Sequence, residues 1–236
     1  MKIPPFSTAE YDRRIAAARA AMQARDLEAM IVTDPSNQAW LTGYDGWSFY
    51  VHQAVILPAE GQPIWWGRGQ DANGARRTVD TDRTGIVGYP DNFVQSTERH
   101  PMQHLAGTLA DMQIGGGRIG LEMDNYYFSA RAHQVLVETL PAAQLVDATG
   151  LVNWCRAVKS DEELDFMRRA ARIAEQVCQV AIDMAAPGVG KNEIAAEVMR
   201  AGILGLGADW GDYPAIVPLM PSGSDAAAPH LTWNGD

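Results

Sequence analysis

The chain has little cysteine and a deficit of positive charge, and each scarcity argues against a class of protein. Its 236 residues include two cysteines, Cys155 and Cys178, which form no CxxC pair and no cysteine–histidine cluster. We therefore expect reduced thiols that pack on helices, not a disulfide framework or a zinc finger. Lys and Arg number 19 against 29 Asp and Glu, for a formal net charge of −10. A protein that binds the phosphates of a nucleic acid needs a face rich in Lys and Arg, so we expect no nucleic-acid partner.

Long apolar runs are also missing. No stretch approaches the roughly 18 apolar residues that a membrane span needs, and residues 1–14 lack the apolar segment of a secretory signal. We therefore expect a cytoplasmic protein that does not enter membranes. The composition, 47% hydrophobic and 20% charged, predicts a full hydrophobic core and argues against disorder.

Two glycine-rich stretches imitate nucleotide-binding motifs without their structural context. Residues 115–120 satisfy GxGxxG, but a helical pattern precedes them and a strand pattern contains their end. The dinucleotide motif needs the opposite order, so we interpret these residues as a helix-to-strand turn. Residues 188–191 resemble the end of a P-loop, but the first glycine of that motif is missing before them. Asn192 also occupies the position where a P-loop has Ser or Thr. HExxH and GxSxG are absent as well, so the sequence contains no self-contained metal or nucleophile site.

The first part of the chain alternates strand and helix patterns. This alternation predicts an α/β fold, with a three-layer N-terminal domain around a mixed sheet over residues 1–155. The expected strands are 29–33, 49–57, 63–66, 85–87, 118–122 and 144–146, and the expected helices are 7–25, 34–43, 71–79, 96–112 and 128–139.

The pattern changes in residues 156–236. Ser160 and three following acidic residues predict the start of a long helix that ends near residue 185. The turn 187–190 separates it from a second helix over 192–204, and strand-like segments follow. We expect these elements to open a second, α+β domain.

Residues 40–52 hold five aromatic side chains and form the first candidate site. We expect Trp47 and Phe49 to alternate with Tyr50 and His52 along a strand. The ring faces would then form a wall for a flat or cationic small molecule, because aromatic faces attract delocalised cations. The alternative is a well-filled core with an exposed edge, in which His52 is structural.

His230 is the second candidate. It follows a loop of small residues, 222–228, where backbone can approach a ligand closely, and we expect it to start a strand. Its imidazole can donate or accept a proton near neutral pH. The alternative is a core histidine without catalytic function.

Three segments together resemble the creatinase/prolidase/aminopeptidase P family, whose catalytic domain has the pita-bread fold. These are Arg156–Ser160 with Glu162 and Glu163, the turn 187–193, and the 222–230 segment that ends in Pro-His. The resemblance implies that His230 is an active-site histidine and that 156–236 begin a pita-bread domain. It also implies that further catalytic residues follow the position of His230, so that this chain is an N-terminal fragment, inactive alone.

Within that family, residues 34–37, 44–53, 211–218 and 228–233 are most similar to members that hydrolyse the cyclic amidine ectoine. The resemblance implies acid–base ring opening without a metal or other cofactor, with His230 catalytic. It implies substrate binding by Trp47, Phe49, Tyr50 and His52. It further implies a homodimer in which the N-terminal domain reaches the partner's active site. Creatinase has an arginine near this aromatic segment, where this chain reads Phe-Tyr-Val-His, so the partner of the substrate carboxylate is left unidentified.

Two alternatives stay open. A metal-dependent Xaa-Pro peptidase would need two Asp, one His and two Glu ligands beyond His230, so no metal ligand can be named in this sequence. A binding or scaffolding protein of the same fold would have no turnover.

Overall fold

A computed structural model describes residues 5–210 and 216–231 of the chain. Residues 211–215 and 232–236 contain parts of two of the motifs quoted above, and most of the strand expected after His230. Both lie outside the described residues. The chain divides into two compact units at the boundary between Val158 and Lys159.

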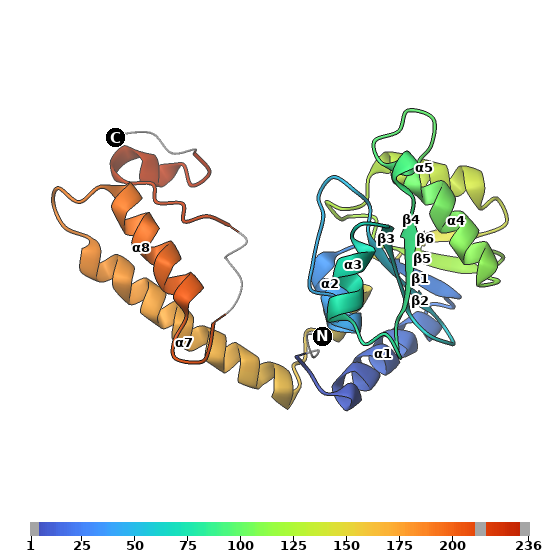
Figure 1. Cartoon of the computed structure of the whole chain (residues 1–236), viewed down its shortest axis with the longest axis horizontal. Coiled ribbons are helices and arrows are strands. Elements are labelled where there is room, and N and C mark those ends of the chain that lie inside the picture. Colours follow the sequence, from blue (N-terminus) through green and yellow to red (C-terminus); the bar gives the residue numbers. More distant parts are fainter. Residues whose placement is uncertain (1–4, 211–215, 232–236) are drawn as a thin grey trace. The chain divides into compact units, whose positions relative to one another are not determined.

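The N-terminal unit is built around a six-stranded mixed sheet with the order β4-β3-β2-β1-β5-β6 (Figure 1). β2 pairs antiparallel with both β1 and β3, whereas the pairs β3 with β4, β1 with β5, and β5 with β6 are parallel. The mixed sheet expected from the sequence is confirmed. The strands are β1 (Ala29–Val32), β2 (Ala54–Pro58), β3 (Ile64–Arg68), β4 (Gly85–Tyr89), β5 (Arg118–Leu121) and β6 (Gln144–Asp147).

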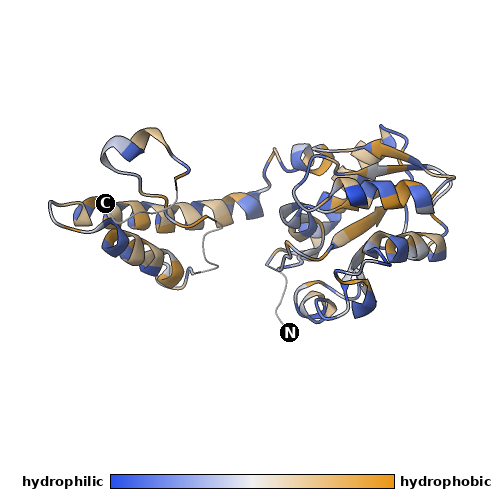
Figure 2. Ribbon diagram, turned by 90° about the horizontal axis from the view of Figure 1, so that it is seen from above, coloured by the Kyte–Doolittle hydropathy of each residue, from blue (hydrophilic) through white to orange (hydrophobic). Residues whose placement is uncertain are grey.

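Helices cover both faces of this sheet and give three layers. One buried cluster joins one face to α1 (Thr8–Gln23), α2 (Pro35–Thr42), α3 (Ala72–Thr78) and α6 (Leu151–Cys155). The other joins the opposite face to α4 (Pro101–Asp111) and α5 (Ala130–Thr139). Hydrophobic colour follows the strands between the layers in Figure 2.

Two adjacent tryptophans on β3 link the sheet to both layers. Successive strand residues point to opposite faces, and Trp65 and Trp66 are both fully buried. The Trp65 ring packs 5.0 Å from Tyr44. On the other face, Trp66 packs 4.7 Å from Tyr89 and its Nε1 donates to His104 Nδ1 at 3.1 Å.

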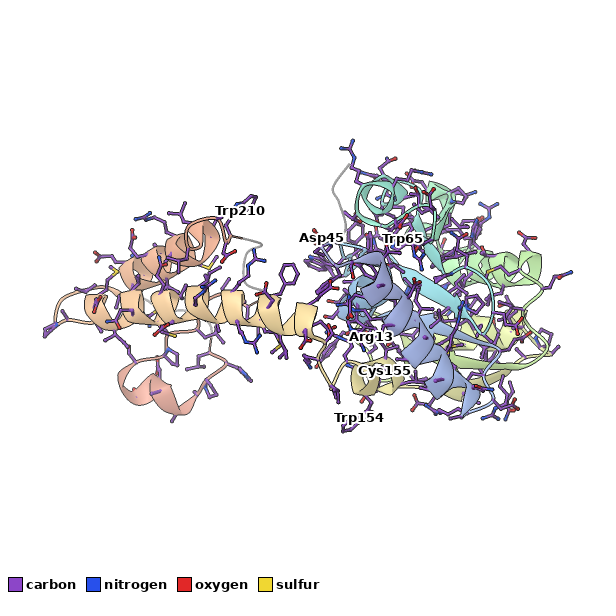
Figure 3. All side chains as sticks on the ribbon, turned by 90° about the horizontal axis from the view of Figure 1, so that it is seen from below. Arg13, Asp45, Trp65, Trp154, Cys155 and Trp210 are labelled. Carbon is purple, nitrogen blue, oxygen red and sulfur yellow. The ribbon has the colours of Figure 1, made fainter. Side chains whose placement is uncertain are left out.

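Four local features differ from what the sequence predicts. β2 begins at Ala54 and not at residue 49, so the aromatic residues before it belong to no strand. α4 begins at Pro101 and not at 96, because the His100 side chain caps its first turn. The short helix α6 was not expected. It carries the exposed Trp154 and the half-buried Cys155 (Figure 3), whereas Cys178 is exposed and does not pack as expected.

The second unit opens with two helices, α7 (Asp161–Met184) and α8 (Lys191–Leu204). The Ser160 hydroxyl accepts from Glu163 N at 3.2 Å and the Glu163 carboxylate accepts from Ser160 N at 2.8 Å, the capping box that the sequence predicts. A 3-10 helix, Gly223–Ala227, precedes His230. Within the described residues of this unit, β structure is limited to one bridge between Leu206 and Asp209. In the described part of the chain, no helix has both the length and the apolar character needed to cross a membrane.

Candidate functional site

The candidate residues of the N-terminal unit lie at one edge of the sheet. The carboxyl ends of β1, β3, β4 and β5 meet the amino end of β2 there, as the registers Val32 with Val55 and Ala54 with Trp66 require. Ligands of open α/β sheets commonly bind outside the carboxyl ends of strands. Binding residues of this unit are therefore expected at this edge.

A buried carboxylate organises this edge. Glu122, directly after β5, accepts hydrogen bonds from Thr33 N at 2.6 Å, Asp34 N at 2.7 Å and Asn37 Nδ2 at 2.6 Å. Arg156 Nη1 in turn donates to Asn37 Oδ1 at 2.6 Å. Burial raises the pKa of Glu122, and these hydrogen bonds act in the opposite direction.

The same carboxylate explains why residues 47–53 are not a strand. β1 ends at Val32, and the next two backbone amides donate to Glu122 instead of to a neighbouring strand. Helix α2 then starts at Pro35, capped by the Asp34 side chain, which accepts from Asn37 N at 3.0 Å. No β1 backbone is left beside residues 47–53, so they form an irregular segment.

Three aromatic rings project from this segment. Trp47, Phe49 and Tyr50 are 51%, 79% and 52% exposed. The centroids of Trp47 and Phe49 are 5.8 Å apart, and those of Phe49 and Tyr50 are 5.5 Å apart. The structure thus brings together three of the four residues expected in an aromatic wall. We call these three the aromatic row.

A cation lies at the Tyr50 end of the aromatic row. Arg68, the last residue of β3, donates from Nη1 to Tyr50 Oη at 3.4 Å. Its Nε and Nη2 donate to the two carboxylate oxygens of Asp91 at 2.8 and 3.0 Å. The carboxylate raises the pKa of Arg68, and the guanidinium lowers the pKa of Asp91.

His52 belongs to a histidine pair and not to the aromatic row. Its ring centroid is 5.2 Å from that of His100, and the ring hydrogen-bonds the backbone of Tyr127. His100 Nδ1 accepts from Met102 N at 3.2 Å as the cap of α4. Burial lowers the pKa of both rings; that of His100 falls to about 4, with smaller contributions from His52 and Arg131.

In the second unit, His230 lines an apolar cavity of about 620 Å³. It lies in a turn after the 3-10 helix, and Leu231 is not in a strand. The expectation that a strand begins here is therefore not met at the described positions. The other lining residues are Asn192, Ala195, Ala196, Met199, Val217, Pro218, Leu219 and Leu231. An imidazole in such a wall could transfer a proton to or from a bound molecule.

A second cavity in this unit, of about 340 Å³, is lined by Trp210 and by residues of an ionic cluster. Arg169 Nε donates to Asp209 Oδ1 at 2.7 Å, and Arg172 Nη2 donates to Asp209 Oδ2 at 3.2 Å. These guanidinium groups lower the pKa of Asp209. The cluster ties α7 to the segment after α8, and we interpret it as structural.

The described residues contain no group of three His, Cys, Asp or Glu side chains placed to hold a metal ion. Sequence reasoning missed Arg68, Asp91, Glu122 and His100 at the sheet edge. A partial signal was present, because Arg68 and Glu122 each lie at the carboxyl end of an apolar strand pattern. The strand order that brings them beside residues 47–52 could not be read from those patterns.

Solved prolidases and dipeptidases share this fold. A prolidase from Thermococcus sibiricus matches 98% of this chain and 59% of its own, with a TM-score of 0.76 and 18% identity. Dipeptidase PepE from Mycobacterium ulcerans matches 83% and 50% with a TM-score of 0.64 and 23% identity. At these identities the likeness shows the fold alone.

The chain belongs to the creatinase/prolidase family. Residues 14–158 match the Creatinase/Prolidase N-terminal domain, and residues 165–236 match Metallopeptidase family M24.

Curated relatives cover nearly the whole chain. It is 50% identical to the ectoine hydrolase of Halomonas elongata over 240 residues, which are 98% of this chain and 59% of that protein. It is 39% identical to an uncharacterized hydrolase/peptidase of Sinorhizobium fredii, with the same two shares, 98% and 59%. The chain thus spans 59% of the length of either relative.

Proposed function

We propose that the full-length protein containing this chain is an ectoine hydrolase. The observation that carries the proposal is 50% identity to the Halomonas elongata enzyme over 98% of the chain. The aromatic row is chemically suited to the substrate, because ectoine carries a delocalised amidinium that ring faces attract.

The proposed reaction is the hydrolysis of a cyclic amidine. Water adds to the carbon between the two ring nitrogens, one carbon–nitrogen bond of the ring breaks, and that nitrogen leaves as an amine. The carbon stays on the other nitrogen as an acetyl group, which gives N-acetyl-2,4-diaminobutyrate. His230 transfers protons between the attacking water and the leaving nitrogen, as a general base and then a general acid.

The aromatic row and the His230 cavity belong to different units, and we propose separate roles for them. The row binds the cationic part of the substrate, and His230 moves protons. We further propose a homodimer in which the N-terminal unit of one subunit serves the active site of the other, and a reaction that needs no metal.

The test is ectoine consumption by the full-length protein, followed by NMR with and without EDTA, for the wild type and His230→Ala. Turnover that resists EDTA and falls at least about 100-fold in the variant supports the proposal, since acid–base groups contribute about 10²–10⁴-fold. An undiminished rate in His230→Ala would remove this residue from the mechanism. A fall in rate with EDTA would refute the metal-free reaction.

A metal-dependent Xaa-Pro dipeptidase is the second candidate. It is favoured by the match of residues 165–236 to Metallopeptidase family M24. Cleavage of Xaa-Pro dipeptides that stops with EDTA and returns with divalent metal, together with no loss of ectoine, would establish it in place of the first.

A further inference from the structure

The arginine at the end of the aromatic row has a geometry that the proposed reaction does not yet use. Arg68 ends β3 and Tyr50 lies in the irregular segment before β2, and their polar atoms Nη1 and Oη lie 3.4 Å apart. From Tyr50 the rings continue through Phe49 to Trp47 in steps of 5.5 and 5.8 Å. A guanidinium thus lies at one end of a row of exposed aromatic rings.

We propose that Arg68 and Tyr50 bind the carboxylate of a small zwitterionic substrate whose delocalised cation lies on Phe49 and Trp47. This inference rests on the proposed function for the identity of the zwitterion. It supplies the carboxylate partner that the sequence left unidentified.

The hydrogen-bond inventory supports the assignment. A guanidinium has five N–H donors and no acceptor. Asp91 accepts from Nε and Nη2, which fixes the plane of the group. The two protons of Nη1 are not used by Asp91, and one of them is directed to Tyr50 Oη. Because that hydroxyl accepts from Arg68, its own proton can be donated, so a carboxylate would meet two converging donors.

The ion pair with Asp91 orients Arg68 without cancelling this role. The Asp91 side chain is 65% exposed and that of Arg68 is 18% exposed, so water screens the carboxylate more than the guanidinium. The pair is neutral overall and so is a zwitterion. Recognition therefore depends on the placement of donors and ring faces, and gives specificity more than raw attraction.

Two ligands separate the carboxylate from the cation. They are ectoine and 2-methyl-1,4,5,6-tetrahydropyrimidine, which keeps the amidinium and lacks the carboxylate. Their dissociation constants are measured by calorimetry on the full-length protein, for the wild type, Arg68→Gln, Arg68→Lys and Phe49→Leu. Arg118→Gln is the matched control, because Arg118 begins β5 at the opposite edge of the sheet and donates to Gln144 Oε1 at 2.8 Å.

We expect the wild type to bind ectoine about tenfold more tightly than the analogue, the size of one charge-assisted hydrogen bond. Arg68→Gln should abolish this preference and leave the affinity for the analogue unchanged. Arg68→Lys should keep part of it, because lysine retains the charge but not the planar donor geometry. Phe49→Leu should weaken both ligands by a similar factor, and Arg118→Gln should change neither.

Equal weakening of both ligands in Arg68→Gln, or an unchanged preference, would overturn the assignment. So would a wild type that binds neither ligand. Ectoine turnover, measured in parallel, separates a failure of the Arg68 assignment from a failure of the proposed function. An Arg68-dependent preference without turnover leaves the assignment standing and sinks the proposed function, and turnover with an Arg68-independent preference does the reverse.

Discussion

Acidification should destabilise the N-terminal unit through His100, and His100→Asn should remove that sensitivity. Neutral His100 accepts the Met102 amide at the start of α4. Protonation of Nδ1 would replace this acceptor with a donor and place a charge beside His52 and Arg131. Asparagine is among the strongest helix caps and does not titrate, so the variant keeps the cap without the proton.

The direction and size of this loss of stability follow from the pKa of His100. Its value in the folded protein is about 4, mainly because of burial, against 6.5 in the unfolded chain. Below pH 6.5 the unfolded chain therefore binds more protons, and the free energy of unfolding falls as pH drops from 6.5 toward 4. A shift of this size corresponds to about 2.5 kcal/mol lost between pH 7 and pH 4.5, which we reduce to about 1 kcal/mol because the ring is half exposed.

The assay is urea unfolding followed by tryptophan fluorescence at pH 7.0, 5.5 and 4.5. The wild type should lose about 1 kcal/mol more than His100→Asn between the extremes. The pKa of His52 is also lowered by burial, so its contribution has the same sign and persists in the variant. Parallel pH profiles of the two proteins would refute the role of His100.

Other perturbations test the packing behind the site. Glu122→Ala leaves three donors, two of them buried, without their acceptor and should lower the free energy of unfolding by about 3–5 kcal/mol; a loss below about 1 kcal/mol in urea unfolding would contradict the network. Gly120→Ala places a Cβ 2.9 Å from two buried side chains and should cost about 1–3 kcal/mol. The control is Gly107→Ala, on an open helix face, which should raise the free energy of unfolding by about 0.5–1 kcal/mol. Thermal melts in which the two variants change stability equally would contradict the packing at Gly120. The exposed Cys178 should react with a thiol reagent faster than Cys155, whose pKa is raised by burial. Cys178→Ser should therefore lose the fast phase of the reaction, and a fast phase that remains in this variant would contradict the prediction.

The three-layer core could be predicted because its signals are local. The expected helix start at Ser160 is confirmed, since a capping box involves four successive residues. The central strands are short apolar runs that are buried throughout, as β1 and β2 are. The start of α4 was missed because a histidine is an unusual cap, and its choice over Ser96 depends on tertiary packing against His52.

The candidate site was predicted in part, and one distant residue accounts for the difference. Glu122 lies 89 positions from Thr33, and no local pattern reveals that its carboxylate takes the amides after β1. That contact ends the pairing of β1 at Val32 and leaves the segment before Ala54 without β1 as a neighbour. The alternation of side chains along a strand therefore does not apply to residues 47–53. Their aromatic rings project together, whereas a strand would have divided them between its two faces. The close approach of Tyr50 to Arg68 follows from the antiparallel pairing of β2 and β3, which sets residues just before Ala54 beside the carboxyl end of β3. The edge that we propose binds a zwitterion is thus a product of strand order and one buried carboxylate.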